Sequence, residues 1–89
     1  MARFEFTSLT SVECAAEGGA PDALFELGLM YCAGREVSID FVSAHKWFNL
    51  AALRGNDEAK RYRSELAREM TRVQISSAQK QAREWISRH

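Results

Sequence analysis

Cysteine is scarce in this 89-residue chain, which contains only Cys14 and Cys32. The two residues form no Cys-x-x-Cys pair, and no histidine and acidic residues accompany them at metal-ligand spacing. We therefore expect two free thiols that act as small buried apolar groups, with no metal and no cofactor. A disulfide or a metal site is the less favoured alternative. Free thiols are typical of a reducing compartment and indicate the cytoplasm.

A long apolar segment is also missing. Near the N-terminus, Glu5 and four hydroxyl residues interrupt the apolar positions, so the sequence has no signal-peptide pattern. No stretch approaches the length that spans a membrane. These absences predict a soluble cytoplasmic protein without a membrane partner.

Strand patterns are absent too, because no run of alternating β-branched residues occurs and the only proline, Pro21, stands at a predicted helix start. Helix start and stop signals are frequent instead, and they predict an all-α fold of five helices with short links. The start signals are a Thr10/Glu13 capping box, Pro21, Asp40, Asn56 and a Thr71/Gln74 capping box, and the stop signals are Gly18-Gly19, Ala33-Gly34 and Gly55.

The third predicted helix, from Phe41 to about Arg54, has apolar residues on almost every side. Its main stripe is Phe41, Ala44, Phe48, Ala51 and Ala52, with Trp47 and Leu50 beside it and Val42 and Leu53 across the helix. This pattern predicts the middle element of a stack. The last two helices have one stripe each, formed by Ala59, Tyr62, Leu66 and Met70 and by Ile75, Ala78, Ala82, Trp85 and Ile86.

An internal echo links two segments 36 positions apart. Ala15-Ala16-x-x-Gly19-x-x-x-Ala23 is matched by Ala51-Ala52-x-x-Gly55-x-x-x-Ala59, and Asp22 is answered by Glu58. In both copies the glycine falls between two predicted helices. A period of this length is typical of helical repeat proteins, which bind partners more often than they catalyse reactions.

Residues 40–59 resemble the second helix and exit turn of a Sel-1-like repeat, a relative of the tetratricopeptide repeat. The matching positions are Asp40, Ala44, Trp47-Phe48, Ala51-Ala52, Gly55 and Ala59, and upstream Ala23, Leu27-Gly28, Tyr31 and Gly34 resemble the first helix and loop glycine of that family. The resemblance covers one full unit at residues 20–55. The whole chain is similar to the short, single-domain bacterial members.

Both flanks of this unit depart from the family pattern. Residues 1–19 read as a degenerate N-terminal half-unit, 56–71 as a degenerate first helix of the next unit, and 72–89 as a C-terminal capping helix. We therefore expect a single domain. The resemblance implies an α/α superhelical scaffold for protein–protein contact, without catalytic residues or a cofactor.

The net charge is zero, but its distribution is uneven. Residues 1–36 have two arginines against six acids, and residues 37–89 have ten basic residues against six acids. The fourth helix is basic, which raises a nucleic-acid hypothesis. Acidic residues stand at helical spacing from these basic residues and can pair with them, as Asp57–Arg61, Arg61–Glu65 and Glu65–Arg68. We therefore expect no nucleic-acid partner.

Five residues are candidates for contact with a protein or peptide partner: His45, Trp47, Asn49, Arg61 and Tyr62. His45 and Asn49 lie one turn apart beside the core stripe, where they could line a groove or could satisfy buried backbone groups. Trp47, Arg61 and Tyr62 are residue types that concentrate binding energy when they are accessible. The expected groove has helices two and four as one wall.

No catalytic constellation is visible in the sequence. Cys32 and His45 are the only conceivable thiol–imidazole pair, and their spacing does not bring them together. We therefore expect a protein that is not an enzyme.

Self-association as a homodimer or a larger homo-oligomer is the alternative to an interaction scaffold. Stable solenoids usually need about three repeats, and this chain has fewer. A two-fold dimer would bury the exposed edge of a terminal helix.

Overall fold

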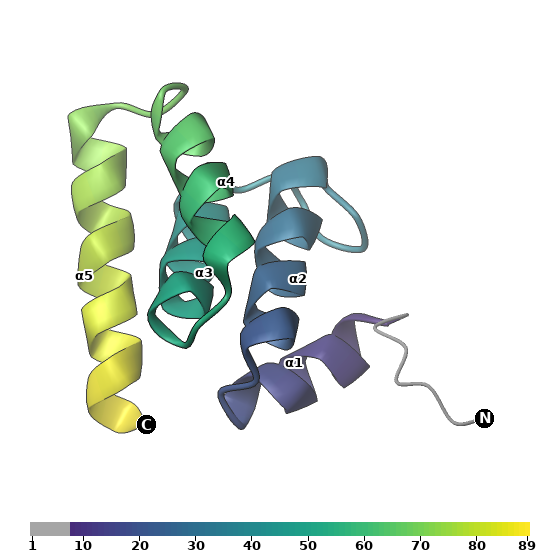
Figure 1. Ribbon diagram of the computed structural model, residues 1–89. Coiled ribbons are helices and arrows are strands. Elements are labelled where there is room, and N and C mark those ends of the chain that lie inside the picture. Colours follow the sequence, from purple (N-terminus) through teal and green to yellow (C-terminus); the bar gives the residue numbers. More distant parts are fainter. Residues whose placement is uncertain (1–7) are drawn as a thin grey trace.

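The computed structural model describes residues 8–89, which form five helices and no strand. The helices are α1 (Leu9–Glu17), α2 (Pro21–Ala33), α3 (Phe41–Leu53), α4 (Asp57–Ala67) and α5 (Arg72–Arg88). α3 lies between α2 and α5, and α4 lies in front of it (Figure 1). The predicted all-α fold is confirmed. The predictions for residues 1–7, including the absence of a signal peptide, fall outside the described residues.

α1 begins earlier than the sequence predicts. Ser8 is its N-cap, and the Oγ of Ser8 accepts a hydrogen bond from the backbone N–H of Ser11 at 3.2 Å. The predicted Thr10/Glu13 capping box is therefore wrong. Ser8 offers the same kind of cap two residues closer to the N-terminus, so the helix starts there.

The other predicted caps are confirmed. The side chains of Asp40, Asn56 and Thr71 accept hydrogen bonds from the N–H groups of Ser43, Ala59 and Gln74 at 3.1, 3.0 and 3.1 Å. Gln74 completes the capping box of α5, because its Oε1 accepts from the N–H of Thr71 at 2.9 Å. These contacts pair N–H groups that a helix start otherwise leaves free.

The turns after α1 and α3 have the same backbone hydrogen bonds. In each turn the N–H of the glycine donates to the carbonyl three residues before it, and the next N–H donates to the carbonyl five residues before it. Gly19 and Gly55 both have positive φ, at +82° and +109°, a region that favours glycine. Ala23 and Ala59, four residues further on, are both fully buried. The 36-residue echo therefore corresponds to two turns of the same kind.

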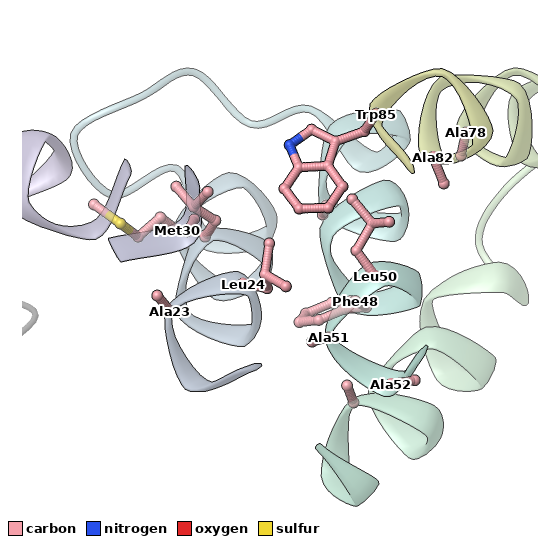
Figure 2. Close-up of a cluster of buried hydrophobic side chains, with 14 of the residues drawn as sticks. Ala23, Leu24, Met30, Phe48, Leu50, Ala51, Ala52, Ala78, Ala82 and Trp85 are labelled. Atoms are coloured by element: carbon pink, nitrogen blue, oxygen red, sulfur yellow. The ribbon is translucent and has the colours of Figure 1, made fainter. Parts of the chain in front are cut away.

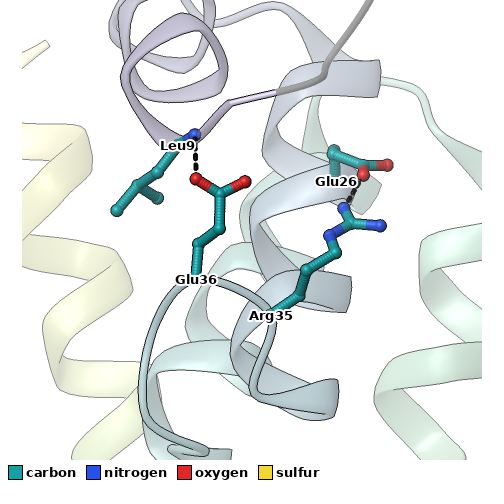
Figure 3. A network of polar contacts seen from close by, with 4 residues as sticks. All are labelled: Leu9, Glu26, Arg35 and Glu36. Carbon is teal, nitrogen blue, oxygen red and sulfur yellow. Dashed lines mark hydrogen bonds and ion pairs between the residues drawn. The ribbon is translucent and has the colours of Figure 1, made fainter.

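The link between α2 and α3 is attached to both of the first two helices (Figure 3). Arg35 forms an ion pair with Glu26 of α2. Glu36 accepts a hydrogen bond from the N–H of Leu9, the first residue of α1, at 3.3 Å. These two contacts fasten the link to α1 and α2, and the one with Leu9 spans 27 residues of sequence.

α3 is the central helix, as its apolar pattern predicts, because α2, α4 and α5 all pack on it while α1 packs on α2. Figure 2 shows Phe48 and Leu50 of α3 in the core, with Trp85 reaching toward them from α5. The buried apolar residues are Val12, Ala16, Ala23, Leu24, Leu27, Met30, Ala44, Phe48, Leu50, Ala51, Ala52, Ala59, Leu66, Met70, Ala78, Ala82 and Trp85.

Three residues expected in the interior lie elsewhere. Leu53 is 64% exposed, because it faces away from the main stripe at the last turn of α3. Ile86 is 49% exposed, since Trp85 takes the inward position and the next residue is rotated by about 100°. Cys14 is exposed on α1 and Cys32 is only partly buried, so the expectation of two buried thiols is wrong for Cys14.

Gly28 allows α2 and α3 to approach closely. A β-carbon at this position would lie 2.4 Å from the ring of Phe48, which is fully buried. The ring of Phe48 packs against Phe25 of α2 and Tyr62 of α4, with centroids 5.7 and 5.6 Å apart. A single aromatic cluster therefore joins α2, α3 and α4.

We expect the Gly28→Ala variant to be destabilised by about 1–2 kcal/mol, because overpacking outweighs the gain in helix propensity. Urea unfolding followed by circular dichroism measures the change. Gly18→Ala is the matched control, because a β-carbon there would lie 3.5 Å from its nearest neighbour, an ordinary contact. Equal stability of the two variants would contradict the close approach.

Candidate partner-binding surface

The five candidate residues do not form one surface. Trp47 packs against Trp85 of α5, with ring centroids 6.4 Å apart. Asn49 faces α4 instead, where its Oδ1 accepts a hydrogen bond from Nη1 of Arg63 at 2.6 Å. The structure therefore divides the α3 candidates between the side of α5 and the side of α4.

His45 is buried, with only 4% of its surface exposed. Its Nδ1 has no hydrogen-bond partner. Burial lowers the pKa of His45 below its usual value, and the positive charge of Arg63 lowers this pKa further. This burial favours a structural role for His45 over direct contact with a partner. The expected hydrogen bond to a buried backbone group is not made by Nδ1.

We expect the free energy of unfolding to contain a pH-dependent contribution from His45. Because the folded pKa lies below the unfolded value of about 6.5, the unfolded chain binds the proton more readily. Stability is therefore fully present above pH 6.5 or so and falls as the pH drops through the folded pKa. Urea unfolding between pH 5 and pH 8 measures it, and a His45→Leu variant should lose this contribution.

The His89→Gln background is needed as a control, because the pKa of His89 is shifted upward and gives the opposite slope. In that background, identical pH dependence with His45 and with Leu at position 45 would rule out the contribution of His45.

Arg61 and Tyr62 are neighbours on α4 with different surroundings. Arg61 is exposed, its Nη2 lies 3.4 Å from a carboxylate oxygen of Glu58, and its guanidinium carbon lies 5.7 Å from the ring centroid of Tyr62. Tyr62 is only partly exposed, because its ring meets Phe25 edge-on at 5.1 Å. Arg61 is thus accessible, whereas Tyr62 contributes mainly to the core.

The predicted charge pairs on α4 are not the ones that form. Lys60 and Asp57 lie 3.9 Å apart, and Arg61 pairs with Glu58, so both ion pairs have i,i+3 spacing. The expected Asp57–Arg61, Arg61–Glu65 and Glu65–Arg68 pairs are all absent from the ion pairs among residues 8–89. Glu58 is closer along the helix surface to Arg61 in the observed rotamers, so it takes the guanidinium.

A hollow of about 330 Å³ lies beside Trp47. Its lining residues are Glu13, Ala16 and Glu17 of α1, Leu27 of α2, Trp47 of α3 and Trp85 of α5. The sequence predicts α2 and α4 as one wall of the groove; α2 does line this hollow, through Leu27, but α4 does not. α4 contributes nothing to it because α4 packs on another side of α3, where its aromatic ring is used in the core.

His89 contacts two of the residues that line this hollow, Trp85 and Glu17. Its ring stacks on Trp85, with centroids 3.8 Å apart and planes 10° from parallel. Nε2 lies 2.7 Å from Oε1 of Glu17, and Nδ1 lies 2.8 Å from the carbonyl oxygen of Trp85. The hydrogen bond with Glu17 is the main cause of the upward shift in the pKa of His89, followed by the bond with the Trp85 carbonyl.

Sequence reasoning missed Glu13, Glu17 and Trp85 as lining residues of this hollow, and the contacts of His89 with two of them. The sequence predicts Trp85 in the core, which is correct, since it is 4% exposed. Glu17 and His89 are 72 residues apart, and no local pattern connects them. The only available signal was the residue type of His89. Histidine stacks on aromatic rings and pairs with carboxylates, and this one stands at the end of the last helix.

Comparisons of the chain with protein-family models, with curated proteins and with solved structures found no match. Among residues 8–89, no group of three or more histidine, cysteine or acidic residues is arranged to hold a metal ion. Within the same residues, no helix combines the length and the apolar character needed to cross a bilayer.

Proposed function

We propose that this protein is a non-catalytic interaction scaffold that binds a protein or peptide partner, built as a small α/α repeat of the Sel-1-like type. The matching turns after α1 and α3 support the repeat, because they share hydrogen bonds, positive-φ glycines and a buried alanine at a spacing of 36 residues. The unpaired thiols favour the cytoplasm, where they stay reduced.

The observation that carries the binding function is the hollow at Trp47. Both tryptophans of the chain line it, and Trp47 is only partly buried although it is a large apolar side chain. Partly exposed aromatic side chains in concave sites are the usual centres of binding energy in protein interfaces. A partner that inserts one side chain here would complete the burial of Trp47.

A photo-crosslinking amino acid at position 13 tests this function, because Glu13 is exposed on the rim of the hollow. We expect it to capture a polypeptide in extract of the native cells. The matched control carries the crosslinker at Arg68, an exposed position next to the end of α4. The captured protein, once purified, should bind the unmodified chain, and its affinity should fall about tenfold or more in a Trp47→Ala variant. Equal capture at both positions would argue against the hollow.

The chemistry of Cys32 supports the non-catalytic part of the proposal. Burial raises the pKa of this thiol, so less of it is present as the reactive thiolate at neutral pH. Rapid stoichiometric labelling of Cys32 by iodoacetamide at pH 7 would contradict this interpretation, and a Cys14→Ser background removes the signal of the exposed thiol.

Self-association is the second candidate function, and exposed apolar side chains favour it. Within residues 8–89 the large ones are Ile39, Leu53, Val73 and Ile86, which are 61%, 64%, 78% and 49% exposed. Ile39 also lines a hollow of about 480 Å³ together with Phe41 and Val42. Sedimentation velocity across concentration and salt decides the matter, because a strict monomer would exclude the oligomer.

A further inference from the structure

The hollow at Trp47 has an acidic and aromatic lining. Glu13 and Glu17 lie one helical turn apart on α1, and they are the only charged residues among those that line it. The indole rings of Trp47 and Trp85 and the side chain of Leu27 supply the apolar part of the wall. A carboxylate next to an aromatic face is the environment in which a cation is stabilised twice, by charge and by the ring quadrupole.

His89 does not line the hollow, but it supplies a basic group that contacts two of the lining residues. Its imidazole lies flat against Trp85, and its Nε2 is within hydrogen-bond distance of Glu17. When protonated, the ring is a planar cation that is stacked on an indole and paired with a carboxylate. A guanidinium group would make the same two contacts, because it is planar, stacks on aromatic faces and donates in a fork to a carboxylate.

Three further cations lie close to these rings or to one another, and none of them lines the hollow. Nζ of Lys46 lies 4.1 Å from the ring centroid of Trp47, and the guanidinium carbon of Arg54 lies 5.7 Å from that of Trp85. Arg88 is close enough to Lys46 to lower its pKa, although burial of Lys46 is the larger cause. The rings therefore attract cations on more than one side, while the space between them is bordered only by the carboxylates of Glu13 and Glu17.

We propose that this hollow is a receptor for one basic side chain, arginine or lysine, of a partner polypeptide, and that His89 competes with the partner for two of the lining residues, Glu17 and Trp85. The inference rests on the proposed interaction function and names the chemistry of its partner. A volume of about 330 Å³ lies at the small end of the range of ligand sites, which suits a single side chain. An acidic partner residue would instead meet two carboxylates.

The test uses three short peptides, acetyl-Gly-Arg-Gly-amide, acetyl-Gly-Lys-Gly-amide and acetyl-Gly-Gln-Gly-amide. Trp47 and Trp85 are the only tryptophans of the chain, so the two indole N–H signals in a nuclear magnetic resonance spectrum report on the site alone. At neutral pH we expect both signals to shift with the arginine and lysine peptides. The glutamine peptide should leave them in place, and equal shifts with all three peptides would overturn the preference for a cation.

The role of His89 is tested by a His89→Ala variant titrated with the arginine peptide. Removal of an internal competitor frees Glu17 and one face of Trp85 in a larger fraction of the molecules, so we expect the Kd to fall about threefold or more. An unchanged Kd would show that His89 only fastens α5 to α1 and would overturn this half of the proposal. Circular dichroism confirms that the variant is folded.

The role of the carboxylate is tested in the same His89→Ala background. Glu17→Gln removes the charge but keeps the size, and we expect the Kd for the arginine peptide to rise about tenfold. Glu69→Gln, at an exposed position beside the end of α4, is the matched control and should change nothing. If a crosslinked partner depends on Trp47 but not on Glu17, the proposed function stands and the basic-side-chain inference fails.

Discussion

A Phe48→Ala variant should lose about 3–5 kcal/mol of its free energy of unfolding. The ring of Phe48 is fully buried in the central helix, and it contacts Phe25 of α2 and Tyr62 of α4. Removing it leaves a cavity where three helices meet. Because folded proteins have a free energy of unfolding of only about 5–15 kcal/mol, this loss would be a large share of the total. Urea unfolding followed by circular dichroism measures the loss.

Two variants sharpen this experiment. Phe48→Leu keeps most of the apolar volume, so it should cost clearly less than the alanine variant. In combination with Gly28→Ala, the leucine should also relieve the clash that the added β-carbon causes with the Phe48 ring. The double variant should therefore be more stable than the sum of the single changes predicts. Strict additivity would contradict a direct contact between the two positions.

Local sequence signals predict most of the fold correctly. Helix caps and stop glycines act within one turn, so Asp40, Asn56, Thr71 and Gly34 mark helix ends without knowledge of the rest of the chain. The error at Ser8 is of the same local kind, because two hydroxyl residues compete to cap one helix. The order of the helices and their ends could thus be predicted, while the choice between adjacent caps could not.

Burial is harder to predict, because periodicity gives the apolar face of a helix but not the neighbour that covers it. Leu53 and Ile86 are apolar and lie beside buried positions, yet both are largely exposed. His45 shows the reverse case, a titratable residue that the packing of α4 against α3 buries. Whether these residues are buried or exposed depends on the positions of the neighbouring helices.

The candidate site was least predictable, because its members come from four helices. Trp47 could be chosen from the sequence as a binding residue, since its type and its place beside the core stripe are visible there. The sequence assigns Glu13 to a helix cap and His89 to the C-terminal capping helix, and it gives Glu17 no role. Their meeting depends on how α1 and α5 are docked, which no local pattern specifies.

Trp85→Ala should release α5 from the rest of the protein. Trp85 is the only large side chain that α5 buries fully, because its other buried residues are Ala78 and Ala82. Its removal should cost about 3–5 kcal/mol, and most of that loss falls on the contact of α5 with α3. We expect amide hydrogen exchange to accelerate throughout α5, while the amides of α2 and α3 stay protected.

Ile86→Ala is the matched control, because Ile86 is the next residue on the same helix and is 49% exposed. In the Ile86→Ala variant, the amides of α5 should exchange at nearly the rate of the unmodified chain. If Trp85→Ala lost protection equally in all helices, the local release of α5 would be contradicted. The Trp85→Ala variant also bears on binding, because Trp85 lines the hollow and stacks on His89. One side chain thus docks the last helix and shapes the candidate site, so any change that loosens α5 should also weaken partner binding.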